Sequence, residues 1–180
     1  MDFREITEFF KDFMGYIIFI LVLIIIFTFI IGFHPIAGNS MVPNLEEGDV
    51  LLVSKLHPNL IDVKRKQIVV IKKDHKSYIK RIIGLPSENV YVKDNKLYIN
   101  DKEYTESYLD KDIENRDFTF EEICDIDECP NGVIPKDMYL VLGDNRENSE
   151  DSRSFGLISK KEIKGLAFFG IWPLNSIGKA

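Results

Sequence analysis

The sequence is poor in the residues that bind metals or build disulfide scaffolds. Its 180 residues include two cysteines, three histidines and one tryptophan. Two cysteines alone make neither a disulfide framework nor a four-thiolate zinc site. Cys124 and Cys129 have a C-x4-C spacing with no second pair of ligands, so we predict no metal site and no cofactor. The two residues could form a disulfide in an oxidising compartment or remain as reduced thiols.

A glycine-rich phosphate loop and an excess of positive charge are also missing. The first absence argues against a nucleotide-dependent enzyme. The chain carries 23 Lys and Arg against 29 Asp and Glu, a net charge of −6, so we expect no nucleic-acid partner. Hydrophobic residues make up 45% of the chain, which excludes wholesale disorder.

Apolar residues concentrate near the amino terminus. The segment from Gly15 to Phe33 has no charged residue and is apolar on all sides. As a helix it would be ~28 Å long, close to the hydrocarbon thickness of a bilayer. A core helix would show a polar stripe, and a cleavable signal peptide would have a basic leading region and a small-residue cleavage site. We therefore predict a transmembrane helix at 15–33, after a cytoplasmic or interfacial segment at 1–14.

The Lys and Arg residues that flank this segment predict its orientation. Arg4 and Lys11 precede it, and no Lys or Arg follows until Lys55. We expect a single-pass protein of the cell membrane with a cytoplasmic amino terminus and an extracytoplasmic domain at 34–180. The lipid bilayer is then a partner, and no obligatory protein partner is predicted.

Short β-rich runs separated by turn residues dominate the rest of the chain. The predicted strands are Val50–Ser54, Gln67–Lys72, Ser77–Ile83, Asn89–Val92, Lys96–Ile99 and Met138–Leu142. Asp94-Asn95 is typical of a tight hairpin turn. The fold class is therefore mainly β, with one transmembrane helix followed by an antiparallel β domain.

Two further segments of this domain stand out by composition. Residues 101–129 hold twelve Asp or Glu against three Lys or Arg, which favours a solvated acidic excursion at 100–136. Leu166–Leu174 is apolar but too short to cross a bilayer as a helix. It fits a core strand, or else an aromatic surface that rests on the membrane.

Three clusters of residues could carry chemistry. Ser40 lies in a turn flanked by Gly38 and Pro43, which exposes its hydroxyl. Lys80 lies on a predicted strand with apolar neighbours, and burial there would favour its neutral form, a general base near pH 7. Residues 143–153 combine turn formers with paired charges that could frame a site. Each cluster alone is more typical of an ordinary loop or strand.

Together and in this order, the clusters closely resemble the bacterial type I signal peptidases of the compact Gram-positive type. The matching motifs are Ser-Met-x-Pro, Lys-Arg-x-Ile-Gly-x-Pro and Gly-Asp-Asn-Arg-x-x-Ser-x-Asp-Ser-Arg. The resemblance implies a membrane-anchored serine protease with an antiparallel β catalytic domain. Its substrates would be secretory preproteins, cut after small residues in an Ala-x-Ala pattern.

The resemblance also implies a role for each matching residue. Ser40 would be the nucleophile and Lys80 the general base, oriented by the hydroxyl of Ser149. An ion-pair frame would support them, formed by Asp151, Arg146 and Arg153. The substrate-binding residues would be Ile36, Gly38, Met41, Leu45 and Ile79. Gly38 replaces a serine of many relatives whose hydroxyl helps to stabilise the oxyanion, so the backbone N–H of Ser40 would carry this task.

Three alternatives remain open at this point. A Ser-His hydrolase could use His34, His57 or His75. Ser77 and Lys80 match the S-x-x-K motif of penicillin-recognising enzymes, although that motif needs a helix. An anchored β module could also act by interaction alone. A lysine base predicts activity that rises with pH.

Overall fold

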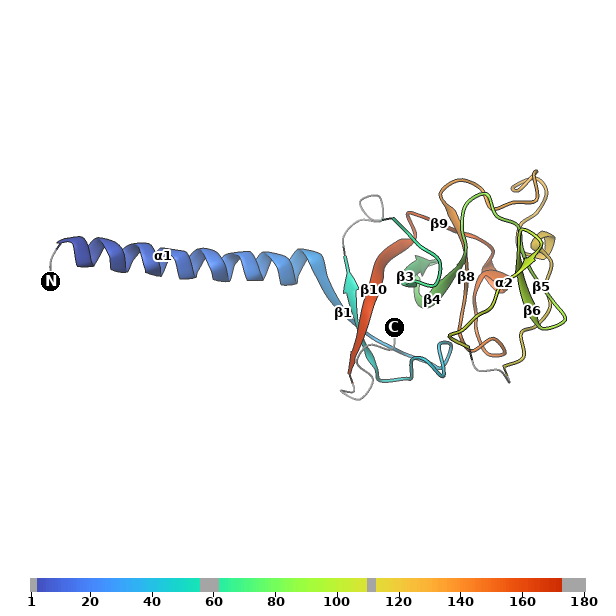
Figure 1. Ribbon diagram of the computed structural model, residues 1–180, viewed down its shortest axis with the longest axis horizontal. Helices are drawn as coiled ribbons and strands as arrows, with labels where there is room; N and C mark the ends of the chain where they lie inside the picture. Colours follow the sequence, from blue (N-terminus) through green and yellow to red (C-terminus); the bar gives the residue numbers. More distant parts are fainter. Residues whose placement is uncertain (1–2, 56–61, 110–112, 173–180) are drawn as a thin grey trace.

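The computed structural model describes residues 3–55, 62–109 and 113–172, and it consists of one long helix and a β-rich domain (Figure 1). The helix projects away from one end of the domain, and the small sheet that contains β5 and β6 lies at the opposite end. Helix α1 spans Phe3–Ile25 and continues as a π-helical turn over Ile26–Ile30. The predicted class, mainly antiparallel β with one amino-terminal apolar helix, is confirmed.

The apolar helix fits a membrane anchor. The span Phe10–Ile30 has 21 residues, none of which is buried against the rest of the protein, and it would be about 32 Å long. It ends earlier than the expected limit at Phe33. Ile31–Phe33 belong instead to strand β1, where they pair with the last residues of strand β2. Hydrogen bonding to a neighbouring strand thus decides where the helix ends.

A seven-stranded sheet forms most of the domain, in the order β1-β2-β10-β3-β4-β8-β9. Every pairing in it is antiparallel. Its strands are β1 (Ile31–Pro35), β2 (Val50–Ser54), β3 (Ile68–Lys73), β4 (Lys76–Gly84), β8 (Met138–Leu142), β9 (Ile158–Ser159) and β10 (Ile163–Trp172).

A second sheet of three strands contains β5 (Val90–Lys93), β6 (Lys96–Ile99) and β7 (Lys102–Glu103). Lys93 pairs with Lys96, so the predicted two-residue hairpin turn at Asp94-Asn95 is confirmed. Both turn residues have positive φ, of 50° and 65°, as a tight hairpin requires. The only helical elements described after the π-helical turn are the short η3 (Phe120–Glu122) and α2 (Ser152–Phe155).

Three groups of buried side chains stabilise the domain. One lies between the two sheets and contains Ile83, Val90, Phe118, Phe120 and Leu140. A second contains residues of β3, β4, β8 and β10, among them Val69, Ile82 and Val141. The third, which borders the candidate site, contains Ile36, Met41, Leu45, Leu51, Val53, Ile68 and Val70.

The predicted strands agree with the structure to within one residue at each end. Three short or irregular strands were not expected, namely β1, β7 and β9. The apolar run that begins at Leu166 lies in β10, which is paired on both sides by β2 and β3, so the prediction of a strand is correct, and Leu166 is buried in the core at 2% exposure. Phe168 is nevertheless 51% exposed. Residues 173 and 174 lie outside the described residues.

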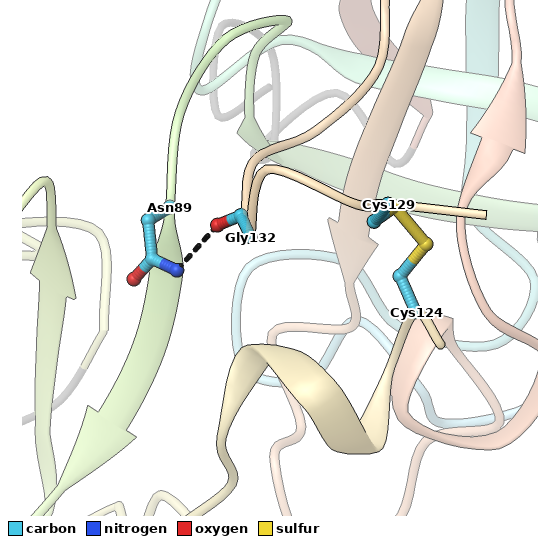
Figure 2. Close-up of a disulfide and its surroundings, with 4 residues drawn as sticks. All are labelled: Asn89, Cys124, Cys129 and Gly132. Carbon is cyan, nitrogen blue, oxygen red and sulfur yellow. Dashed lines mark hydrogen bonds between the residues drawn. A yellow bond between two sulfur atoms is a disulfide. The ribbon is translucent and has the colours of Figure 1, made fainter. Parts of the chain in front are cut away.

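The acidic excursion is not the solvated loop that its composition favoured. Phe118 and Phe120 are 4% and 2% exposed and pack into the core between the sheets. Cys124 and Cys129 form a disulfide within the same segment (Figure 2). Close by, the Asn89 side chain donates a hydrogen bond of 2.7 Å to the Gly132 carbonyl and so ties the end of this segment to the start of β5. A minority of apolar residues at the right positions fixes the segment against the sheet, while most of the acidic residues that the structure describes there face water.

Candidate active site

Ser40 lies in the turn that follows strand β1, and its side chain is half-buried. Two hydrogen bonds join this turn to the loop after β8. The backbone N–H of Asn145 donates to the Ser40 carbonyl at 3.0 Å, and the Asn145 side chain donates to the Asn39 carbonyl at 3.0 Å. Segments that are about 100 positions apart in the chain are thereby held together at this point.

Gly143 allows this close approach. An added Cβ at Gly143 would lie 2.5 Å from the Ser40 carbonyl oxygen and would also overlap the Ser149 hydroxyl. Any larger residue would therefore displace the Ser40 backbone. The sequence indicated Gly143 as part of a turn-rich cluster, but only the structure shows why no side chain fits there.

Lys80 lies in β4, opposite Val69 of β3. Its side chain is long and charged in water, yet it is only 2% exposed. The Lys80 amine makes no hydrogen bond or ion pair within the part of the chain that the structure describes. Burial lowers the pKa of Lys80 from 10.5 to about 8, against the opposing effect of the nearby Asp151 carboxylate. A substantial share of this amine is thus neutral in mildly alkaline solution.

Ser40 and Lys80 open into one cleft of about 220 Å³. Its walls come from the end of β1 with the following turn and from the first half of β4, and Val70 of β3 also lines it. Strands β1 and β4 are four positions apart in the sheet order, so the sheet must curve to bring them to one cleft. The lining residues are His34, Pro35, Ile36, Ala37, Ser40, Met41, Val70, Ser77, Tyr78, Ile79 and Lys80.

The predicted substrate-binding residues divide into two groups. Ile36, Met41 and Ile79 line the cleft. Leu45 does not, because it packs at 2% exposure within the core next to the cleft. Gly38 is exposed, is not part of the lining, and has φ of +84°, with open space around the position of a Cβ.

Ser149 is beside Ser40 and Gly143. Its hydroxyl oxygen is buried and has no hydrogen-bond partner in the described part of the chain, and the geometry at Gly143 places it next to the Ser40 backbone. A buried hydroxyl without a partner costs about 1–3 kcal/mol. An oxygen in this state is available to a partner that arrives during a reaction.

The predicted ion-pair frame is only partly correct. Asp151 is fully buried and accepts hydrogen bonds from Arg153 Nε and Nη2 at 2.9 and 2.7 Å, and from the Gly143 N–H at 3.0 Å. Arg146, however, does not pair with Asp151. Its guanidinium donates to both carboxylate oxygens of Glu106, with the Nη1 distance at 2.9 Å, while its Nε donates to the Gly143 carbonyl at 3.0 Å.

A further buried ion pair, between Arg81 and Asp144, was not predicted either. Arg81 donates to both oxygens of Asp144, at 2.8 and 2.6 Å, and both residues are nearly inaccessible. Asn44 donates to the same carboxylate at 2.9 Å, and the Arg81 guanidinium stacks on the Tyr108 ring at 4.4 Å. The alternation on β4 indicated that a cation would face apolar neighbours there. It could not identify Asp144, which is 63 positions away.

The structure bears on two of the alternatives, the Ser-His hydrolase and the penicillin-recognising enzyme. His34 lines the cleft, His75 is exposed in the β3–β4 turn, and His57 is outside the described residues. Ser77 and Lys80 lie on strand β4 rather than on a helical turn, so the penicillin-recognising arrangement is excluded. Within the described ranges, no group of three or more His, Cys, Asp or Glu side chains is placed to hold a metal ion.

Comparison with known proteins assigns the family. A family model described as signal peptidase, peptidase S26, matches residues 7–172. The chain belongs to this family. It is therefore a serine endopeptidase of the signal peptidase I type, and its amino-terminal apolar helix fits the anchor of a membrane signal peptidase.

Two similar proteins agree with this assignment over most of their length. A signal peptidase I of Bacillus amyloliquefaciens is 37% identical over 91% of this chain and 88% of its own length. A signal peptidase IB of Staphylococcus aureus is 36% identical over 86% of this chain and 84% of its own length. A crystal structure of a signal peptidase I from Enterococcus faecalis has a TM-score of 0.49 and 33% identity, and the match covers 58% of this chain and 96% of that one.

Proposed function

We propose that this signal peptidase removes amino-terminal signal peptides from secretory preproteins with Ser40 as nucleophile and Lys80 as general base. One observation carries the assignment: a buried amine with no partner in the described chain opens into the same cleft as a half-buried serine hydroxyl. A serine hydroxyl needs an adjacent base to act as a nucleophile. An amine with a pKa of about 8 is deprotonated at modest cost near neutral pH.

In the proposed reaction, the neutral Lys80 amine accepts the proton of the Ser40 hydroxyl as the oxygen attacks the scissile carbonyl. The tetrahedral intermediate collapses to an ester between Ser40 and the signal peptide. Lys80 returns the proton to the leaving amine of the mature protein, and the same amine then activates the water that hydrolyses the ester. The Ser40 backbone N–H is the proposed oxyanion donor, since Gly38 has no hydroxyl to contribute.

Ser149 and the charged frame are proposed to position this pair. The unpartnered Ser149 hydroxyl can accept a hydrogen bond from the Lys80 amine. This contact would orient the amine so that the lone pair of its nitrogen points at the Ser40 hydroxyl. Asp151, held by Arg153, fixes the backbone at Gly143 and thereby the adjacent Ser40 carbonyl. Arg146 supports the same glycine from its other side, through the Gly143 carbonyl.

The cleft also supports a preference for small side chains next to the cut. Its volume of about 220 Å³ would have to hold several substrate residues, and Ile36, Met41 and Ile79 contribute apolar walls. Alanine fits such a space without a cavity or a clash. We therefore propose Ala-x-Ala-type cleavage sites.

We propose that the amino terminus is cytoplasmic and that the β domain is extracytoplasmic. Ser40 is ten residues after the helix end at Ile30, which would hold the cleft close to the outer face of the bilayer and raise the effective concentration of membrane-bound substrates. The Cys124–Cys129 disulfide supports this side, because disulfides persist in oxidising compartments.

The test is cleavage of a purified preprotein by the full-length protein in lipid vesicles. We expect no processing by Ser40→Ala or Lys80→Ala, at unchanged circular dichroism. His34→Ala is included because His34 lines the same cleft and could serve a Ser-His mechanism. Retained cleavage by Lys80→Ala together with loss in His34→Ala would overturn the lysine assignment.

A further inference from the structure

Three carboxylates act on the Lys80 amine, and they differ in how they are compensated. The Asp151, Glu150 and Asp144 carboxylates each raise the pKa of Lys80 against the dominant effect of burial, and the Arg153 guanidinium lowers it. Asp151 is paired with Arg153, and Asp144 with Arg81. Glu150 makes no ion pair within the described chain, so its negative charge is the uncompensated one of the three.

Glu150 is joined to the cleft through Tyr78. Glu150 follows Ser149 directly and precedes Asp151, so its backbone belongs to the loop that flanks the proposed catalytic pair. Its carboxylate accepts a hydrogen bond of 3.1 Å from the Tyr78 hydroxyl. The Tyr78 side chain lines the cleft, and its ring packs against Phe155 with the centroids 5.4 Å apart.

Tyr78 and Lys80 are also two positions apart on β4, so their side chains leave the same face of the strand. The Tyr78–Glu150 hydrogen bond thus links the strand that carries Lys80 to the loop that carries Ser149. Tyr78 is well suited to this contact as a neutral donor. Partial desolvation and the hydrogen bond to Glu150 raise the pKa of its hydroxyl, which keeps it protonated through the working range of the enzyme.

We propose that Glu150, held beside the cleft by the hydrogen bond from Tyr78, moves the pH range of this peptidase to higher pH by stabilising the protonated form of Lys80. Glu150 acts through Lys80, so it is a positioning residue and not a catalytic one. The proposal rests on the proposed role of Lys80 as general base. It goes beyond that role because it gives a residue outside the reacting pair an influence on the pH dependence of activity.

The direction of the effect distinguishes this role from ordinary structural support. Removing the charge lowers the proton affinity of Lys80, so more of the amine is neutral at pH 7. With a pKa of about 8, roughly a tenth of the amine is neutral at that pH. A decrease of about half a unit, the scale expected for one exposed charge at short range, raises this share about two- to threefold. Glu150→Gln is thus expected to be more active than the wild type at pH 7 and equally active at pH 10.

The experiment is the pH dependence of kcat/KM for a fluorogenic signal-sequence peptide, with full-length protein in detergent at low salt. Glu150→Gln keeps an acceptor for the Tyr78 hydroxyl but removes the charge. The matched control is Glu147→Gln, an exposed glutamate of the same loop that lines a different cleft, together with Asn95 and Asp117. We expect the alkaline-rising limb to move to lower pH in Glu150→Gln alone, and 1 M salt to reduce the difference, since salt screens an exposed charge.

Tyr78→Phe tests the contribution of the hydrogen bond. It frees the Glu150 carboxylate to move towards water, so the limb should shift in the same direction by a smaller amount. The double variant Tyr78→Phe/Glu150→Gln should match the single Glu150→Gln variant. Once residue 150 carries no charge, loss of the Tyr78 hydroxyl no longer changes the electrostatics at Lys80. An unshifted limb in Glu150→Gln, or an equal shift in Glu147→Gln, would overturn the inference. A wild-type profile with no rising limb would instead contradict the lysine mechanism on which it rests.

His34 lines the same cleft from β1, so the measurement is repeated in a His34→Leu background. The shift caused by Glu150→Gln should persist in this background if the charge acts on Lys80.

Discussion

The buried Arg81–Asp144 pair makes the sharpest stability prediction. Replacing Asp144 with Ala removes three hydrogen-bond acceptor contacts at once, two from Arg81 and one from Asn44. It leaves the Arg81 guanidinium, 5% exposed, without its carboxylate. Among the described residues, the Arg81 guanidinium then keeps only its hydrogen bond to the Lys66 carbonyl and its stacking on Tyr108.

The expected cost follows from burial. Removing one partner of a buried pair typically costs about 3–5 kcal/mol, because the other charge stays desolvated. The chain offers an exposed pair as a control: Lys96 and Glu103 are 2.9 Å apart with side chains 54% and 52% exposed. Removing the Glu103 carboxylate should cost about 0–1 kcal/mol. Glu103→Ala therefore removes an ion pair but leaves the remaining charge, that of Lys96, in contact with water.

The assay is urea unfolding in detergent, followed by intrinsic fluorescence, for the wild type, Asp144→Ala and Glu103→Ala. We expect the free energy of unfolding to decrease by about 3–5 kcal/mol in the first variant and by less than about 1 kcal/mol in the second. In thermal unfolding the first change corresponds to a decrease in Tm on the order of 10 °C. Equal losses in both variants would refute the argument that burial decides the value of the pair.

Three further predictions concern the site and the disulfide. Because burial lowers the pKa of Lys80 to about 8, peptidase activity should rise with pH and be half-maximal near 8, and a flat profile from pH 6 to 10 would contradict a lysine base. Gly143→Ala should lower kcat about 100-fold or more, since the new Cβ displaces the Ser40 carbonyl; wild-type kcat in this variant would show that the Ser40 backbone can shift without loss. Replacing Cys124 and Cys129 with Ser should lower the free energy of unfolding by about 2 kcal/mol, as the short loop predicts, and a thiol reductant should affect only the wild type.

The local sequence patterns were sufficient for the elements of the fold. Short apolar runs with β-branched residues indicated β2 and β8, and Asp94-Asn95 indicated a hairpin turn, because strand periodicity and turn chemistry depend on near neighbours. They failed at β1, whose residues continue the apolar run of the helix. The local sequence around Ile31 does not indicate a partner strand. The pairing with β2 decides the conformation of Ile31.

For the candidate site, the sequence indicated the side chains that we propose to carry the chemistry, and the tertiary structure decided which of them meet. Three clusters could be recognised from residue types and spacing: the turn with Ser40, the apolar strand with Lys80, and the turn-rich charged residues at 143–153. The pairing of Arg146 with Glu106, the pairing of Arg81 with Asp144 and the exclusion of Leu45 from the cleft could not. A charge can pair with any opposite charge that the chain path brings near it, and that path depends on how the whole sheet curves.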